Sequence, residues 1–180
     1  MGRTWNHLTD EVAAFCDRQH VFFVATAPDE GGHVNLSPKG YESFRVLDAL
    51  TVAYIDLTGS GVETIAHLRL NGRITVMFTA FEGPPDIVRI YGVGEALMAG
   101  TDEYAALAPE FPDFRGARAI IRIAIERVSS SCGYAVPLMK YVGERSRLDE
   151  WAASKSDEEM ADYQARNNAV SIDGLPGLFD

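Results

Sequence analysis

Short apolar runs separated by turn residues make up the middle of the chain, and this pattern is typical of β-strands. In the second run, polar Asn35 and Ser37 alternate with apolar neighbours, so one face of that strand is expected to meet polar groups. Gly92 and Gly94 lie inside a longer run and indicate a bulge or a sharp bend. The predicted strands, about six in number, cover residues 20–27, 33–40, 51–58, 73–81, 86–98 and 117–130.

Helices are predicted before, between and after these strands. The helix between the strands at 51–58 and 73–81 is expected to be a crossover element. The last predicted helix begins with a capping box formed by Ser156 and Glu159. Antiparallel strands with bends and flanking helices favour a barrel of the mostly β (α+β) class. The predicted helices cover about 10–18, 61–70, 102–107, 145–155 and 156–168.

Length and composition are those of one globular domain. The chain has 180 residues, of which 47% are hydrophobic and 23% are charged, so it can bury a core of its own. Because no repeat, low-complexity stretch or linker divides the sequence, a single domain over 1–180 is predicted. Its barrel core spans 20–130, and a loop with C-terminal helices spans 131–180.

The charge balance argues against two classes of partner. Because 16 Lys and Arg stand against 26 Asp and Glu, the net charge is −10, which repels nucleic acid and anionic membranes. Cys16 and Cys132 lie far apart without metal-ligand spacing, so neither a zinc site nor a disulfide framework is expected. The N-terminus has no signal-peptide pattern, and no apolar run approaches the ~20 residues of a membrane span. We expect a cytoplasmic protein.

The segment TGSGVET at 58–64 allows two interpretations. Ser60 and Glu63 have the spacing of a capping box, in which the Ser60 hydroxyl accepts a hydrogen bond from the Glu63 amide. Alternatively, free amides at the start of the helix, with the hydroxyls of Ser60 and Thr64, bind a phosphate, which the helix dipole favours. Glu63 opposes the second interpretation, because a carboxylate close to a phosphate costs free energy.

Five consecutive pieces resemble the pyridoxamine 5′-phosphate oxidase-like family of flavin-binding split barrels. They are the strands HVNLSPKG and TVAYIDLT, the loop and helix GSGVETIAHLRLNG, and the strands RITVMFTAF and IVRIYGVGEAL. The best matches are the end LSPKG, the Thr that closes TVAYIDLT, the NGR before the third strand, and YGVGEAL, where the family has Gly-x-x-Glu-x-Leu. The resemblance covers roughly residues 20 to 130.

The resemblance implies a homodimeric Greek-key split barrel that binds FMN in a groove between the two subunits. The cofactor-binding residues that the resemblance implies are Asn35, Leu36, Ser37 and Lys39 at the ring, Leu57 and Thr58 at the ribityl chain, Ser60, Gly61 and Thr64 at the phosphate, and Tyr134 as a pocket wall or a dimer contact. The chain departs from the family in two ways that bear on this site.

The first departure concerns charge. Where the oxidase has a basic pair at its phosphate loop, this chain has Glu63 and Thr64, so the positive charge must come from elsewhere. The second concerns the substrate: segment 129–148 lacks the oxidase's arginine-and-histidine anchor, which disfavours pyridoxamine phosphate. The candidate cations in reach by sequence are Lys39, Arg45, Arg69 and Arg73.

The resemblance therefore implies an FMN-dependent oxidoreductase whose cofactor performs the redox chemistry. No side chain has to act as an acid or base, so no catalytic residue is predicted. Its partners would be a second subunit, and a small-molecule substrate or a nicotinamide electron donor. The alternatives are a deazaflavin-dependent reductase and a flavin- or small-ligand-binding dimer without turnover.

A few residues outside these motifs carry expectations of their own. His67 is predicted to lie on the solvated face of its helix. No redox role is expected for Cys132, because no neighbouring group would lower its thiol pKa. The three arginines of the last strand are expected on its solvent face or at an intersubunit contact, and they are Arg118, Arg122 and Arg127.

Overall fold

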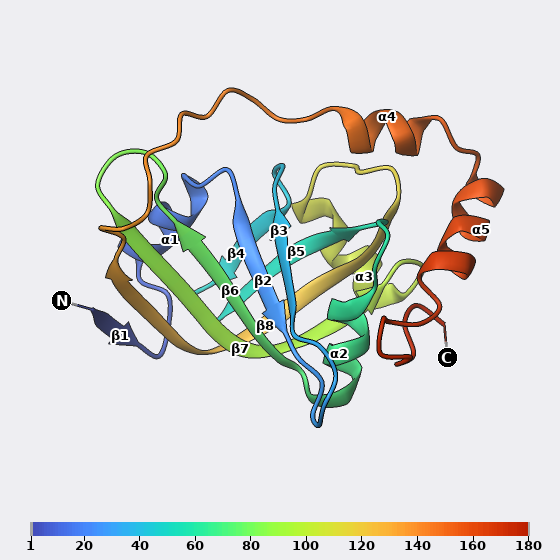
Figure 1. Ribbon diagram of the computed structural model, residues 1–180, viewed down its shortest axis with the longest axis horizontal. Coiled ribbons are helices and arrows are strands. Elements are labelled where there is room, and N and C mark those ends of the chain that lie inside the picture. Colours follow the sequence, from blue (N-terminus) through green and yellow to red (C-terminus); the bar gives the residue numbers. More distant parts are fainter. Residues whose placement is uncertain (1, 180) are drawn as a thin grey trace.

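The computed structural model describes residues 2–179, in which one antiparallel sheet is flanked by helices (Figure 1). Within those residues, eight strands form the sheet in the order β3-β2-β6-β7-β8-β5-β4, with β1 beside β8. The fold is mostly β with peripheral helices, as the sequence predicts. The strands are β1 Arg3–Trp5, β2 Phe22–Thr26, β3 Asn35–Lys39, β4 Phe44–Asp48, β5 Thr51–Leu57, β6 Arg73–Thr79, β7 Asp86–Met98 and β8 Ala117–Cys132.

The sheet curls around an apolar core and leaves one side open. β3 and β4 stand at the two ends of the strand order, which makes the barrel a split one. Inside the curve, fully buried aliphatic side chains pack together, among them Val24, Val76, Ile90 and Ile121. β-Branched residues dominate because they fill a pleated, buried surface well. A second cluster packs the other face of β5 and β8 against the helix at 102–107.

Within residues 2–179, six helical segments flank this barrel. The crossover helix α2 connects β5 to β6 and contacts β2, β6 and β7. Gly72 ends it in the left-handed conformation that glycine adopts readily. The helical segments are α1 Asp10–Asp17, α2 Glu63–Asn71, α3 Asp102–Leu107, the 3₁₀ turn η1 Ala108–Glu110, α4 Arg147–Ala153 and α5 Asp157–Asn167.

After β8 the chain leaves the barrel as a C-terminal arm, residues 133–179. Figure 1 shows its extended first part, 133–146, crossing from the end of β8 to α4 on the other side of the molecule. α5 begins with the predicted capping box, in which Ser156 and Glu159 each bond the other's backbone amide. The segment after α5 then returns to the start of α2, where Gly177 lies close to Val62.

Most of the predicted elements are confirmed, and β7 and α3 have the predicted bounds. The bulge predicted near Gly92 is also confirmed, because the register of β7 with β8 shifts between Tyr91 and Gly92. The strands β1 and β4 were not predicted. Within the described part of the chain, no helix combines the length and the apolar character that crossing a membrane requires.

Candidate functional site

The polar face of β3 meets the beginning of α2. Asn35 Nδ2 donates hydrogen bonds to Thr64 Oγ1 (3.0 Å) and to Thr26 Oγ1 (3.2 Å). Ser37 Oγ donates to Asn35 Oδ1 at 2.7 Å, which fixes the orientation of the amide. The polar residues that alternate along β3 thus contact the start of α2. This contact holds the hydroxyls of Thr26 and Thr64 beside the loop 58–62.

A buried carboxylate with two cationic partners continues this polar surface. Asp56 is 1% exposed; Lys39 Nζ donates to its Oδ1 at 2.9 Å, and Arg118 Nε to its Oδ2 at 2.7 Å. Burial alone would raise the pKa of Asp56, but the two cations outweigh burial and the net effect lowers it. Asp56 is therefore ionised at neutral pH, and the trio carries one excess positive charge.

A bulge in β8 explains why Arg118 points inward. Asp56 pairs with Ala119 and the next residue, Leu57, pairs with Ala117, so Arg118 is an extra residue in its strand. A bulge of this kind redirects a side chain out of the strand's regular alternation. The prediction that Arg118 lies on the solvent face of its strand was wrong, because the residue is only 7% exposed and pairs with Asp56.

Buried polar atoms without partners gather around the same place. Among residues 2–179, five buried side-chain nitrogen or oxygen atoms make no hydrogen bond. Three lie at the polar surface just described. They are Arg118 Nη1, His67 Nε2 on the ring that contacts Thr26, and Tyr54 Oη on β5, two residues before Asp56. A fourth, Asn168 Oδ1, sits where the C-terminal arm meets the loop 58–62, and the fifth, Thr79 Oγ1, lies at the end of β6. Such atoms cost free energy when left unpaired, so their concentration marks a place that suits a polar ligand.

The prediction that His67 faces solvent was wrong. Its ring is fully buried, and burial lowers its pKa, so the ring is neutral at pH 7. Thr26 Oγ1 lies 3.0 Å from His67 Nδ1 and already accepts from Asn35. With the Thr26 hydroxyl assigned as donor to Nδ1, the ring hydrogen is on Nε2, which is then a donor without a partner. We use the name polar cluster for Thr26, Asn35, Ser37, Lys39, Tyr54, Asp56, Thr64, His67 and Arg118.

The loop 58–62 lies beside the polar cluster and is held through its oxygen atoms. The Thr58 hydroxyl donates to Gly116 O (2.7 Å) and accepts from Gln164 Nε2 (2.8 Å). Asn168 Nδ2 donates to Gly59 O at 2.9 Å. No described residue accepts a hydrogen bond from the backbone amides of residues 60–65. The loop therefore presents free donors at the positive end of α2.

The capping-box interpretation of Ser60 and Glu63 was wrong. The N-cap of α2 is Val62, which makes no side-chain capping bond. Ser60 is exposed, and the Glu63 carboxylate accepts from the Ile172 amide at 3.1 Å instead. The C-terminal arm thus binds one oxygen of this carboxylate, while Oε2 lies close to Gly61, 2.3 Å from where a Cβ on that residue would stand.

The structure brings together part of the site predicted from the sequence. Asn35, Ser37, Lys39 and Thr64 belong to the polar cluster, while Leu57, Thr58, Ser60 and Gly61 lie at or beside the loop that borders it. Two predicted residues lie elsewhere within the chain. Leu36 is 65% exposed on the opposite face of β3, and Tyr134 is 83% exposed beyond the far end of β8.

Of the cations proposed for the phosphate, Lys39 alone belongs to the polar cluster. Arg45 donates to the carbonyl oxygen of Glu110, and Arg73 pairs with Asp29 beside the loop after β2. Arg69 lies in the last turn of α2, away from the helix start. Sequence reasoning missed Tyr54, Asp56 and Arg118, although a carboxylate inside the apolar run TVAYIDLT was a signal that a cation lies beside it.

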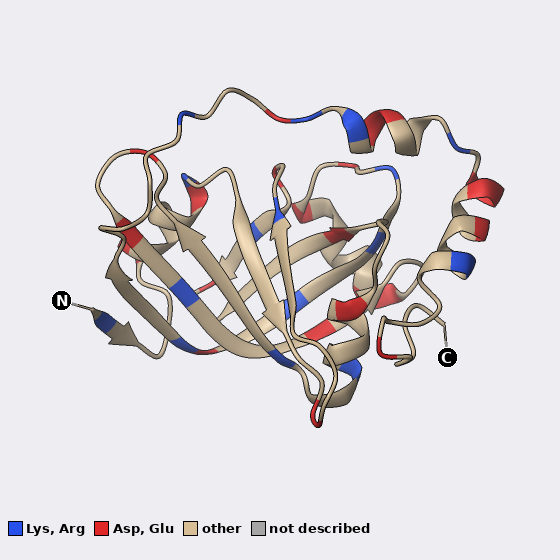
Figure 2. Cartoon of the chain, in the orientation of Figure 1, with Lys and Arg blue, Asp and Glu red and all other residues tan. Residues whose placement is uncertain are grey.

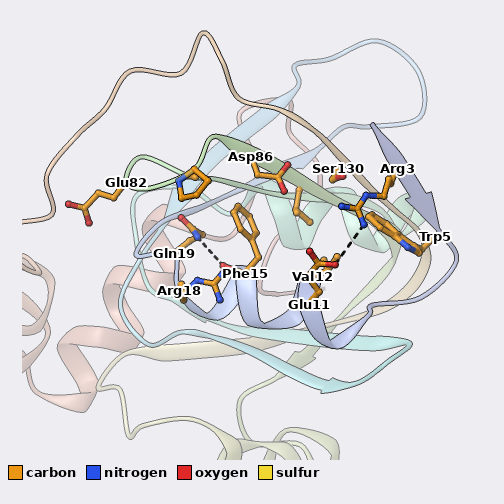
Figure 3. Close-up of a pocket in the computed structure, with 13 residues that line it drawn as sticks. Arg3, Trp5, Glu11, Val12, Phe15, Arg18, Gln19, Glu82, Asp86 and Ser130 are labelled. Carbon is orange, nitrogen blue, oxygen red and sulfur yellow. Dashed lines mark hydrogen bonds and ion pairs between the residues drawn. The ribbon is translucent and has the colours of Figure 1, made fainter. Parts of the chain in front are cut away.

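Cavities elsewhere in the chain are built differently. Figure 3 shows a cavity of about 220 Å³ beside α1 and β1, where Arg3 pairs with Glu11 and Gln19 donates to the backbone of Phe15. A larger cavity of about 760 Å³ lies under the extended part of the C-terminal arm, where the rings of His20 and Tyr141 stack with centroids 3.6 Å apart. Figure 2 shows basic and acidic residues interspersed along the visible elements, without a continuous basic face in this view.

Comparisons with known proteins place this geometry in a family context. Residues 8–132 match the family model described as Pyridoxamine 5′-phosphate oxidase. The pyridoxamine 5′-phosphate oxidase family protein ustO of Aspergillus flavus is 40% identical over 191 residues, covering 97% of this chain and 77% of that protein. The similarity to the Aspergillus flavus protein therefore extends through most of the C-terminal arm.

Solved structures give the same fold. HupZ from Group A Streptococcus is 26% identical and superposes with a TM-score of 0.52, covering 67% of this chain and 91% of that one. A candidate pyridoxamine 5′-phosphate oxidase from Lactobacillus delbrueckii is 23% identical, with a TM-score of 0.53 and coverage of 69% and 94%. The second likeness concerns the fold alone.

Proposed function

The chain belongs to the pyridoxamine 5′-phosphate oxidase family, and we propose that it is an FMN-dependent oxidoreductase. The observation that carries the proposal is the polar cluster beside the free amides of residues 60–65. Unpaired buried donors, an excess positive charge and a helix start together suit a polar, anionic molecule. The substrate is not expected to be pyridoxamine phosphate, because segment 129–148 lacks the arginine-and-histidine anchor.

The residues present fit FMN in the following way. Lys39 keeps further N–H donors beyond the one given to Asp56, and it stands on β3 with Asn35 and Ser37, where the family resemblance puts the ring. The loop 58–62 and the first turn of α2 offer amides and hydroxyls for the ribityl chain and the phosphate. When bound, FMN supplies the hydride or electron chemistry.

The chain's own part is to bind, orient and exclude water. Asn35 is locked by three hydrogen bonds, so the edge of β3 presents a fixed surface rather than a mobile one. Burial raises the pKa of Tyr54, so its hydroxyl stays a donor throughout the physiological range. No side chain of the polar cluster has to transfer a proton, and we name no catalytic residue.

The protein is expected to be yellow as isolated, because a cofactor held by these donors should survive purification. Absorbance at the flavin bands and a released molecule with the mass of FMN are the measurements. Anaerobic NADH or NADPH should bleach the absorbance, and air should restore it. Bleaching would support turnover, whereas a bound flavin that neither nucleotide reduces would favour a binding protein without turnover. A released deazaflavin would favour the deazaflavin-dependent reductase.

Colourless protein that also fails to quench FMN fluorescence on titration would contradict both flavin hypotheses. The matched control for nonspecific quenching is the same titration with heat-denatured protein.

Replacing Ser60 and Thr64 together by alanine should weaken FMN binding several-fold without unfolding, because neither hydroxyl caps α2 through a hydrogen bond to its backbone.

The second part of the proposal is a symmetric dimer with the flavin at the subunit interface. The outward face of β3, β2, β6 and β7 carries half-exposed apolar residues, and Figure 1 shows β2, β3 and β6 in front without a helix over them. Strand register places Leu36, Ala25, Thr75 and Tyr91 in one row across this face. An apolar sheet face of this kind is typical of a protein interface.

The purified protein is expected to have twice the mass of the chain in light scattering coupled to size exclusion. A Leu36→Glu variant should shift it to monomer, because a charge would be buried in the interface. The matched control is Leu50→Glu, since Leu50 is also exposed but lies in the turn between β4 and β5. Wild-type protein with the mass of one chain at micromolar concentration would contradict the dimer.

A further inference from the structure

Among residues 2–179, the polar cluster carries one positive charge that no anion compensates, because Lys39 and Arg118 share the single carboxylate of Asp56. One carboxylate stands between two cations, and the Nη1 atom of Arg118 is buried without an acceptor. The Arg118 side chain is only 7% exposed, so this nitrogen is shielded from bulk solvent. A buried guanidinium nitrogen with no acceptor costs free energy unless an anion pairs with it.

The loop 58–62 begins beside the start of β8, the strand that carries Arg118. Leu57 pairs with Ala117, and both the amide and the hydroxyl of Thr58 donate to Gly116 O, two residues before Arg118. The C-terminal arm bonds the loop through its carbonyl oxygens and the Thr58 hydroxyl, which leaves the amides of residues 60–65 unused. The amides and Arg118 are thus two independent sets of donors on segments that meet where the end of β5 and Thr58 contact the start of β8.

We propose that Arg118 is the cation of a phosphate-monoester site whose other donors are the backbone amides of residues 60–65. This inference rests on the proposed function, in which the phosphate monoester is that of FMN. Arg118 then takes the place of the basic pair that Glu63 and Thr64 replace in this chain. Lys39 keeps Asp56 neutralised, and the Glu63 carboxylate is engaged by the Ile172 amide.

The test compares FMN with riboflavin, which differs only by the phosphate. Titrations followed by flavin fluorescence should show wild-type protein binding FMN about tenfold or more tightly than riboflavin, since charge-assisted hydrogen bonds are the strong ones. Arg118→Gln should remove most of that preference while changing riboflavin affinity by about twofold or less. The matched control is Arg122→Gln, an exposed arginine of the same strand that pairs with Glu95 and should keep the preference.

Equal losses for both flavins in Arg118→Gln, or no preference in wild-type protein, would overturn the role of Arg118 while leaving flavin binding intact. If wild-type protein binds neither flavin, the proposed function fails, and inorganic phosphate is then used to test whether the anion site exists. Phosphate should then raise the melting temperature of wild-type and Arg122→Gln protein, but not of Arg118→Gln, relative to chloride at equal ionic strength; no rise overturns the site. If the Arg118→Gln variant misfolds, the double variant Asp56→Asn with Arg118→Gln is used in its place. The double variant removes the carboxylate of Asp56 together with its partner Arg118.

Discussion

An Asp56→Ala variant is expected to lose about 3 to 5 kcal/mol of unfolding free energy, the usual cost of removing one partner from a buried ion pair. Asp56 holds Lys39 and Arg118 on separate carboxylate oxygens, and without it two cations face each other in a largely buried site. Urea unfolding followed by circular dichroism is the measurement. The loss is large because the attraction is removed and the remaining charges also stay desolvated.

The control for this prediction is Glu95→Ala. Glu95 pairs with Arg122 across the neighbouring β7–β8 ladder, but both side chains are about half exposed, so the expected loss is below about 1 kcal/mol. If the Asp56 variant loses no more than the Glu95 variant, then the Asp56 site is not the desolvated ion cluster described here.

The pH dependence gives this prediction a second measurement. The pKa of Asp56 in the folded state lies below its ordinary value of 3.8, since the two cations outweigh burial. A lowered folded-state pKa contributes stability that is present above the ordinary value and is lost as the pH falls through the folded-state value. The stability gap between wild-type and Asp56→Ala protein should therefore be constant near pH 7 and shrink below about pH 4.

Hydrophobic pattern was enough for the barrel because its strands are short apolar runs, buried in alternation in β2 and most of β6 and buried at five consecutive residues in β5. β7 has glycines where the bulge lies and mostly apolar residues elsewhere, and its bounds were predicted correctly. β4 escaped prediction because all of its residues except Asp48 are half-buried, which leaves no alternation to detect. The strand β1 is three residues long and pairs only with the end of β8, so its sequence carries almost no periodic signal.

The candidate site was predictable only where a local motif carries it. Asn35, Ser37 and Lys39 follow one another on a strand, and the family resemblance selects them. Arg118 lies 62 residues from Asp56, and its inward direction depends on a single-residue bulge that no local pattern encodes. His67 was misplaced because α2 is buried at five consecutive residues, 64–68, whereas the prediction assumed a helix with one wet face.

The C-terminal arm connects these observations. Its contacts with the loop 58–62 come from α5 and the segment after it, through Gln164 and Asn168. From the sequence alone, these residues are expected to belong to a polar surface helix, because the groups they bond lie more than 100 residues away. In the structure they hold the loop by its oxygens, which leaves its amides available for an anion.

A Gly92→Ala variant is expected to lose about 3 kcal/mol or more of unfolding free energy, toward the upper end of the cost of overpacking. A Cβ atom at this position would lie 2.1 Å from Ala124 O and 3.0 Å from Ala124 C. Both atoms belong to the backbone of β8, which pairs with β7 along its whole length, so relief requires the two strands to move apart. Urea unfolding measures the loss, and insoluble expression would agree with it.

Gly94→Ala supplies the matched comparison, two residues along the same strand. There the added Cβ would meet only side-chain carbons, Leu68 Cδ2 at 3.1 Å and Ile74 Cγ2 at 3.2 Å among them. Side chains can shift by a few tenths of an ångström, and alanine also reduces the freedom of the unfolded chain, so the change should stay within about 1 kcal/mol in either direction. Similar losses for the two variants would mean that the strands separate easily at the bulge, and the close approach of β7 to β8 at Gly92 would then have no part in fixing the barrel.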